Sequence, residues 1–330
     1  MNTYEKIFND PQVYIFENRP MFEITKPLKI NYQKTCNCKE NTIGCVTAKE
    51  WLKKMVGIQE FYYESRDIRD KNVHPAVFPI ALPTHFIKLL SHEGELVIDP
   101  FVGAGTTLLA AQDLCRNAVG FDLQEKYVKL SMSRLEQTRL FSKTIQVAIQ
   151  DDAKNMSEYF EDETITLSIT SPPYPEFLTH KRKNKSIRGN LRQNEYYEQV
   201  QQYSNDPRDL GVMKHFEFTK NLSEIYRGIF PKMKTGSHTI VNINDLWKDD
   251  TRYVTHAYVI KALTDAGYEF RNTFIWDKRN LVNKVGIFGW PNNFISLGTT
   301  FEYILDFIKP KKQKNNDSLF CLPFNEKNNL

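Results

Sequence analysis

The sequence has no apolar run long enough to cross a membrane, and its opening segment, MNTYEKIFNDPQ, lacks the apolar stretch of a signal peptide. Both absences argue against a membrane or secreted protein and predict a cytoplasmic location. A large excess of one charge is also lacking: 44 basic and 40 acidic residues give a formal net charge of +4. So small a value does not by itself indicate a nucleic-acid partner. The composition, 41% hydrophobic and 25% charged, favours a folded core.

Cysteine is scarce and lacks the spacing of familiar metal sites. Cys36, Cys38 and Cys45 lie close together, but a zinc site commonly has two CxxC pairs, and no fourth ligand is evident nearby. A reduced loop with free thiols is therefore the preferred interpretation and no metal is predicted, although three zinc ligands stay open as an alternative. Cys115 and Cys321 stand alone and indicate ordinary thiols.

Strands and helices are predicted to alternate over roughly residues 85–310, which favours an α/β fold with a doubly wound, mostly parallel sheet. Apolar runs predict strands over 95–100, 117–123, 146–153, 164–174, 237–245, 269–278 and 300–309. Helical patterns cover 83–90, 108–115, 124–140, 222–233 and 255–267. Upstream, Thr47 and Glu50 have the spacing of a capping box, which predicts a helix that begins there.

The segment DPFVGAGTT joins the first of these strands to a helix. Gly103 and Gly105 allow a tight turn and a close ligand approach, although a nucleotide-binding protein or a plain strand-to-helix turn would show the same pattern. Asp99 precedes the turn, and Asp122 ends the next strand, where an acid typically holds ribose hydroxyls. Leu108 and Leu109 stand where a dinucleotide motif would have its third glycine, so an adenosyl ligand without a pyrophosphate fits better than NAD.

The segment TSPPY, residues 170–174, follows a later strand. Its two prolines predict a rigid turn with few backbone donors, which leaves carbonyl groups and the Ser171 hydroxyl as acceptors. Tyr174 adds an aromatic face. These groups suit an aromatic amine, whose N–H groups need acceptors and whose ring needs a stacking partner. A purely structural Pro-Pro loop is the alternative.

Together, DPFVGAGTT and TSPPY resemble the cofactor and catalytic motifs of the DNA amino-methyltransferases, which make N4-methylcytosine or N6-methyladenine. Over about residues 74–310, HPAVFPIALPTHFI looks like the cofactor-covering motif, GFDL like the ribose-binding motif and QDDA like the adenine-contacting motif. The resemblance implies a Rossmann-like class I methyltransferase that uses S-adenosylmethionine. The cofactor-binding residues it implies are Phe78, Pro79, Asp99, Pro100, Phe101, Gly103, Gly105, Thr106, Thr107, Asp122, Leu123 and Asp152. The catalytic residues it implies are Ser171, Pro172, Pro173 and Tyr174.

The serine at the start of the catalytic motif is similar to the N4-cytosine subgroup, whereas N6-adenine enzymes more often carry Asp or Asn. The cofactor motif comes first here, while many enzymes with SPPY have the reverse order, so the place of the target-recognition region is not carried over. The family implies direct attack of the amine on the sulfonium methyl group, on a base that has left the duplex. Methylation of cytosine carbon 5 is disfavoured, because the sequence has no Pro-Cys dipeptide.

These features predict a site-specific DNA (cytosine-N4)-methyltransferase of a restriction–modification system. An N6-adenine enzyme, an RNA base methyltransferase and a binding module that no longer transfers methyl groups stay as alternatives. The expected partner is double-stranded DNA, with a cognate restriction endonuclease left open and no membrane. The expected DNA contacts belong to a run without acids, residues 181–192. They are Lys181, Arg182, Lys183, Lys185, Arg188 and Arg192.

The predicted organisation has three parts. Residues 1–73 form an N-terminal extension, 74–310 the methyltransferase domain with a basic DNA-contacting insertion at about 176–215, and 311–330 a C-terminal tail.

Overall fold

A computed structural model describes residues 24–39, 42–68, 78–138, 144–175, 206–248, 251–281, 287–288, 296–297 and 299–311. An eight-stranded sheet forms the centre of this part of the chain, in the order β1-β9-β12-β6-β5-β2-β3-β4. The strands in that order are β1 (Ile58–Gln59), β9 (Glu269–Asp277), β12 (Phe301–Ile308), β6 (Met233–Ile243), β5 (Ile165–Thr170), β2 (Leu96–Asp99), β3 (Asn117–Asp122) and β4 (Gln146–Gln150). All are parallel to one another except β12, which runs antiparallel to both of its neighbours. The predicted doubly wound, mostly parallel sheet is confirmed.

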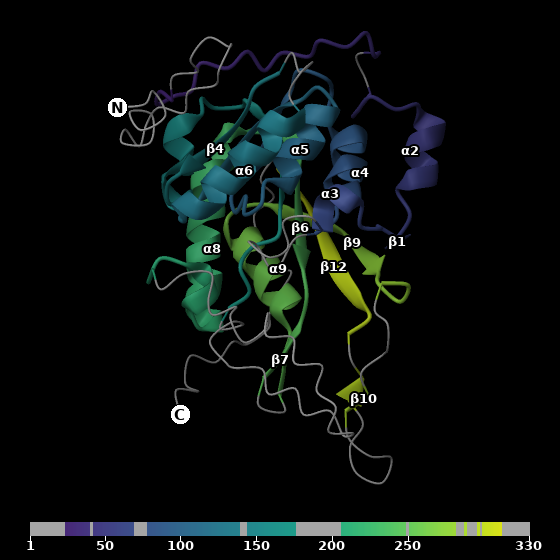
Figure 1. The fold of residues 1–330 in the computed structure, drawn as a ribbon, viewed down its shortest axis with the longest axis vertical. Coiled ribbons are helices and arrows are strands. Elements are labelled where there is room, and N and C mark those ends of the chain that lie inside the picture. Colours follow the sequence, from purple (N-terminus) through teal and green to yellow (C-terminus); the bar gives the residue numbers. More distant parts are fainter. Residues whose placement is uncertain are drawn as a thin grey trace.

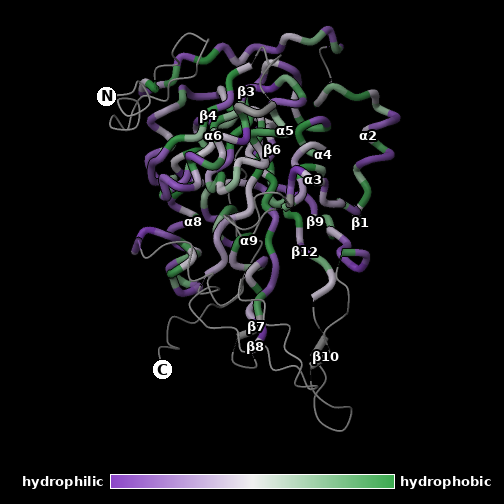
Figure 2. The backbone as a smooth tube through the Cα atoms, in the orientation of Figure 1, coloured by the Kyte–Doolittle hydropathy of each residue, from purple (hydrophilic) through white to green (hydrophobic). Residues whose placement is uncertain are grey.

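Helices cover both faces of the sheet (Figure 1). On one face lie α4 (Ala81–Leu90), α5 (Thr106–Asp113) and α6 (Glu125–Thr138), and on the other lie α8 (His215–Ile229) and α9 (Thr255–Asp265). The alternation of side chains along β2 explains this arrangement, because Val97 packs in the core of α4, α5 and α6 while Leu96 and Ile98 pack in the core of α8 and α9. Figure 2 shows the hydrophobic segments gathered at the centre, between these two helical layers.

The smaller elements border this central unit. They are α2 (Ala48–Lys54), α3 (Ser65–Ile68), the 3₁₀ turns η2 (Ala153–Tyr159), η3 (Leu210–Val212) and η4 (Phe230–Lys232), and the strand pairs β7 (Leu246–Lys248) with β8 (Thr251–Tyr253) and β10 (Ile287–Phe288) with β11 (Ser296–Leu297). Thr47 and Glu50 form the predicted capping box at the start of α2. Among the described residues, no helix has both the length and the apolar character needed to cross a bilayer.

Helix α8 and strand β6 are among the elements whose boundaries differ from the sequence prediction. Helix α8 begins at His215 rather than at residue 222, because the buried Phe218 and Thr219 extend its apolar face by two turns. It ends at Ile229, before Pro231, since a proline ring cannot continue the hydrogen-bond ladder. Strand β6 begins at Met233, four residues earlier than expected, with Gly236 at a φ of 84° within it.

Candidate functional site

The predicted site residues meet at one edge of the sheet. Strands β2, β3, β4 and β5 are parallel neighbours, so their carboxyl ends share that edge. Asp99 and Asp122 are the last residues of β2 and β3, and Ser171 follows the last residue of β5. Asp152 comes two residues after the end of β4. In a sheet of this topology, ligands bind in the crevice outside the carboxyl ends of the strands.

The Gly-rich turn between β2 and α5 is held by α6. Gly105 has a φ of 77°, and a side chain there would bring a Cβ within 2.8 Å of the Cβ of Ser131, so both backbone and space require glycine. The Ser131 hydroxyl donates to the Gly103 carbonyl at 2.7 Å, and the Arg134 guanidinium donates to the Ala104 carbonyl at 2.5 Å. Because these bonds fix the carbonyl groups of the turn, its shape is set before any ligand binds.

Asp99 joins this turn to β5, the strand that leads into the TSPPY segment. Its buried carboxylate accepts hydrogen bonds from the hydroxyls of Thr107 in α5 and Thr170 in β5, both at 2.6 Å, and from the Phe101 amide at 3.1 Å. Burial raises the pKa of Asp99 to about 6, against the lowering effect of these bonds. With only 1% of its surface exposed, Asp99 lies behind the ligand crevice, where it positions the turn and the start of the TSPPY segment.

Asp122 is partly buried at the end of β3 and faces the same turn. One oxygen accepts the Gly103 amide at 3.1 Å and the other accepts the Gln124 amide at 2.8 Å. Burial raises the pKa of Asp122 to about 7, and the negative charges of Asp209 and Asp99 raise it further. A carboxylate has about four acceptor positions, so Asp122 can still accept ribose hydroxyls. The acidic surroundings also suit a ligand that carries positive charge, as S-adenosylmethionine does.

The other expected cofactor residues lie on several neighbouring segments. Asp152 caps η2 by accepting the Lys154 amide at 2.9 Å, and its neighbour Asp151 accepts the Tyr159 hydroxyl at 2.7 Å. Phe78 and Phe101 are partly buried and pack against the two cores, one on each face of the sheet. Pro100, Thr106 and Thr107, in the Gly-rich turn and the start of α5, are buried. Pro79, two residues before α4, is also buried, and Leu123, directly after β3, is partly buried.

The TSPPY turn is partly accessible where the substrate would approach. Ser171, Pro173 and Tyr174 are partly buried, whereas Pro172 is buried. The turn packs against η3, because a Cβ on Gly211 would lie 3.4 Å from the Pro173 Cβ. Residues of η3, 37 or more positions beyond Pro173 along the chain, therefore lie beside the TSPPY turn.

Sequence reasoning missed several residues that hold this site together. Thr170 and Asp209 act beside the turn, and Ser131 and Arg134 act from α6. Thr170 is the first residue of the TSPPY segment, so only its contact with Asp99 was missed, but nothing local in the sequence marks the other three. The expected DNA contacts, Lys181 to Arg192, lie outside the described residues, so that interface stays a prediction.

Parts of the chain are similar to known DNA methyltransferases. Residues 7–133 match the DNA methylase family N6_N4_Mtase. The chain is 42% identical over 69 residues to the Type II methyltransferase M.BglI of Bacillus subtilis, covering 21% of this chain and 20% of the relative. It is 29% identical over 133 residues to the Type II methyltransferase M.MthZI of Methanothermobacter thermautotrophicus, covering 38% of each. The chain therefore spans between about a fifth and two fifths of the length of these relatives.

Among solved structures, TrmN from Thermus thermophilus is similar with a TM-score of 0.43 and 14% identity, over 74% of this chain and 53% of that one. The sheet order and the turn at its carboxyl edge define a Rossmann-like fold of the class I methyltransferase type. Within that class, the matched segments support an amino-methyltransferase family that uses S-adenosylmethionine.

Proposed function

We propose that this protein transfers a methyl group from S-adenosylmethionine to the exocyclic N4 amino group of a cytosine in DNA, as the site-specific enzyme of a restriction–modification system. The observation that carries the proposal is the Asp99 carboxylate, which bonds at 2.6 Å both to Thr107 behind the Gly-rich turn and to Thr170 before Ser171. Two motifs that are 71 residues apart are thereby held by one buried group.

The catalytic turn supplies acceptors for the amino group. An exocyclic amine is a poor nucleophile because its lone pair is delocalised into the ring. Hydrogen bonds from its N–H groups to the Ser171 hydroxyl and the Pro172 carbonyl would localise that lone pair on nitrogen. Tyr174 would stack on a base that has left the duplex. A rigid turn that holds the amine in line with the methyl group then lowers the entropic part of the barrier.

The cofactor, when bound, supplies a methyl group on a positively charged sulfur. Asp122 would accept the ribose hydroxyls, and the glycines of the turn leave space for the ligand to approach the backbone. The carboxylates of Asp99, Asp122 and Asp209 would favour a cationic ligand. DNA as substrate is supported by the match to the DNA methylase family, and a restriction–modification role by the Type II methyltransferases among the relatives.

The product identifies the reaction. Purified protein is incubated with S-adenosylmethionine and either duplex DNA or RNA, and the nucleosides are separated by mass spectrometry after digestion. We expect 4-methylcytosine in DNA. Finding 6-methyladenine would move the target to adenine while keeping the enzyme class, and methylation of RNA alone would reject the proposal.

Ser171→Ala tests the role of the turn in the same assay. We expect a lower kcat with nearly unchanged binding of cofactor and DNA, because the hydroxyl matters most as the nitrogen becomes nucleophilic. Ser133→Ala is the matched control, since Ser133 lies exposed on α6 and, within the part of the chain that the structure describes, its hydroxyl bonds only to the Leu130 carbonyl. Equal rates for both variants would remove Ser171 from the mechanism.

A further inference from the structure

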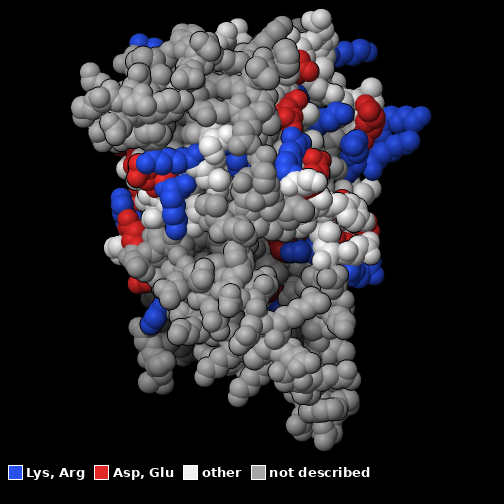
Figure 3. All heavy atoms as spheres, viewed as in Figure 1, with Lys and Arg blue, Asp and Glu red and all other residues white. Residues whose placement is uncertain are grey.

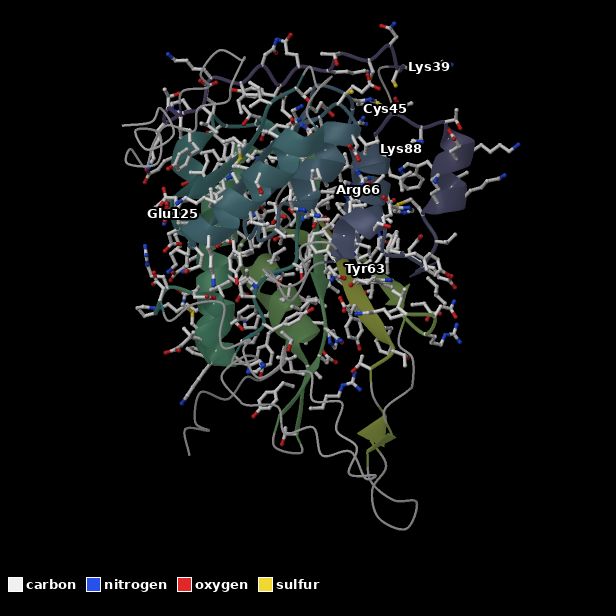
Figure 4. The ribbon with its side chains drawn as sticks, viewed as in Figure 1. Lys39, Cys45, Tyr63, Arg66, Lys88 and Glu125 are labelled. Atoms are coloured by element: carbon white, nitrogen blue, oxygen red, sulfur yellow. The ribbon has the colours of Figure 1, made fainter. Side chains whose placement is uncertain are left out.

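Three cysteines and one histidine come together near the end of α4, at the edge of the sheet opposite to the Gly-rich turn. Cys36, Cys38, Cys45 and His92 each offer one ligand atom, and all four atoms lie within 4.8 Å of one another. Figure 4 shows Cys45 between Lys39 and Lys88, close to the end of α4. His92 belongs to the turn that leads into β2, so the cluster lies at the amino end of that strand, whereas Asp99 and the candidate site lie at its carboxyl end.

The distances match those of a tetrahedral zinc ion. Zn–S bonds of about 2.3 Å and Zn–N bonds of about 2.0 Å at tetrahedral angles separate two sulfurs by about 3.8 Å and a sulfur from a nitrogen by about 3.5 Å. The Sγ atoms of Cys36 and Cys45 are 3.6 Å apart. His92 Nδ1 lies 3.4 Å from Cys36 Sγ and 3.6 Å from Cys45 Sγ. Two sulfurs and one nitrogen thus already occupy three corners of such a site.

The His92 ring is oriented as a ligand. Its other nitrogen, Nε2, lies 2.8 Å from the Thr42 carbonyl, so that Nε2 donates and leaves Nδ1 free to bind a metal. A backbone carbonyl is one of the usual partners of a metal-bound histidine. The His92 amide donates to the Glu95 carboxylate at 2.7 Å, and Lys234 of β6 donates to the other oxygen of Glu95 at 2.8 Å. These bonds connect His92 through Glu95 to β6, and the three cysteines lie next to its ring.

The cysteine loop is held against that turn by its backbone. A Cβ on Gly44 would lie 2.4 Å from the Leu89 carbonyl oxygen, so only glycine allows the loop to lie so close to the last turn of α4. The Thr35 amide donates to the Glu93 carbonyl at 2.8 Å. The Lys34 ammonium donates to the Cys38 carbonyl at 2.6 Å and so holds the backbone of the loop at that cysteine.

We propose that Cys36, Cys38, Cys45 and His92 bind one Zn²⁺ ion. Three sulfurs and one imidazole suit zinc, and four protein ligands leave no open position, which makes the ion structural rather than catalytic. The ion would fasten residues 24–39 and 42–45 to the body of the protein, and Leu28 and Ile30 in the first of these segments are buried in the core. The sequence analysis favoured a metal-free loop because it found no fourth ligand near the cysteines; His92 lies 47 residues beyond Cys45.

Metal analysis of the full chain tests the site. Protein purified without chelator is measured by inductively coupled plasma mass spectrometry, and we expect about one zinc ion per chain. His92→Ala and Cys45→Ser should lose most of that zinc. Cys115→Ser is the matched control, because Cys115 is an exposed thiol outside the cluster and its replacement should retain the full content.

Cobalt substitution decides the outcome even if the variants fail to fold. Wild-type protein reconstituted with Co²⁺ should show thiolate-to-cobalt charge-transfer absorption and the strong visible bands of a tetrahedral ion. Removal of zinc by a chelator should lower the melting temperature, and added zinc should restore it. Wild-type protein that holds no zinc, gives no such spectrum and melts at the same temperature with or without chelator would overturn the proposal.

Discussion

At the scale of single residues, we propose that the charge state of Asp122 sets the pH dependence of cofactor binding. Its pKa lies at about 7 because of burial and the nearby carboxylates of Asp209 and Asp99. The ionised carboxylate would attract the cationic cofactor and accept both ribose hydroxyls, whereas the neutral carboxyl would lose the attraction and part of the acceptor capacity. We therefore predict that affinity for S-adenosylmethionine falls as the pH drops below 7, towards about tenfold per pH unit. Binding near neutral pH should release protons, which calorimetry in buffers of different ionisation enthalpy measures.

Asp122→Asn should remove this pH dependence and weaken binding at alkaline pH. Asp162→Asn is the control, because Asp162 is exposed and pairs with Lys232 at 2.7 Å. Affinity that stays constant across the neutral range in the wild type would contradict the assignment of Asp122.

Thr170 tests whether Asp99 acts as the link between the two motifs. Thr170→Val keeps the side-chain shape but removes a hydrogen bond to a buried carboxylate, which costs about 1.5–3 kcal/mol. We predict lower stability in urea unfolding and a fall in kcat larger than any change in cofactor affinity.

Thr166 lies on the same strand and gives a matched control. It is 8% exposed, and its hydroxyl has no hydrogen-bond partner among the described residues. Thr166→Val should therefore leave stability and kcat unchanged or raise stability slightly. If the two variants behave alike, the bond from Thr170 to Asp99 does not position the catalytic turn.

At the scale of elements, close packing of β3 against the Gly-rich turn maintains the geometry of the candidate site. Gly120 pairs in register with Asp99, and a Cβ on it would lie 2.4 Å from Val102 Cγ2. Gly120→Ala should therefore destabilise the protein by about 1–3 kcal/mol through overpacking. It should also weaken cofactor binding, because the Val102 amide donates to the Phe121 carbonyl at 2.8 Å and the turn follows directly.

A double-mutant cycle in urea checks that explanation. Val102→Ala alone should also destabilise, since Val102 is 4% exposed and its truncation leaves a cavity. Combined with Gly120→Ala, it should recover part of the lost stability. Strictly additive effects would show that the two positions are not in contact.

The central elements could be predicted because their signals are local. Strands β2 and β3 are short apolar runs that end in acids, and α2 carries a capping box within four residues of sequence. The direction of β12 could not be predicted, because a strand has the same apolar pattern in either orientation. The start of α8 was placed too late, since His215 and Phe218 precede the stretch with the clearest period.

Across the whole molecule, what the sequence could not predict is contact between distant segments. Asp99, Asp122 and Ser171 were placed at one edge because parallel strands end together. Arg134, Asp209 and His92 were missed, because each acts on residues far away in the chain and carries no local mark. The structure thus adds the residues that hold the candidate site in place and the fourth ligand of the proposed metal site, whereas the motifs could be recognised in the sequence alone.

The distribution of charge over the whole molecule gives the last prediction. Replacing Lys181, Arg182 and Lys183 by Gln should weaken DNA binding and leave cofactor affinity unchanged. If each contacts a phosphate, the slope of log affinity against log salt should fall by about 2.7 in total, at about 0.9 per contact.

A matched control comes from α2, over which basic side chains gather in Figure 3. Lys49, Lys53 and Lys54 are exposed there, and α2 has no buried residue, so their replacement by Gln removes the same charge without disturbing the core. The two triple variants have equal net charge, so a general electrostatic attraction to DNA would weaken both alike. Only direct phosphate contacts of the run at 181–183 reduce the slope in the first variant and not in the second. Fluorescence anisotropy of labelled duplex DNA over a series of salt concentrations measures both slopes. Equal slopes in the two variants would assign the run to general attraction rather than to the DNA interface.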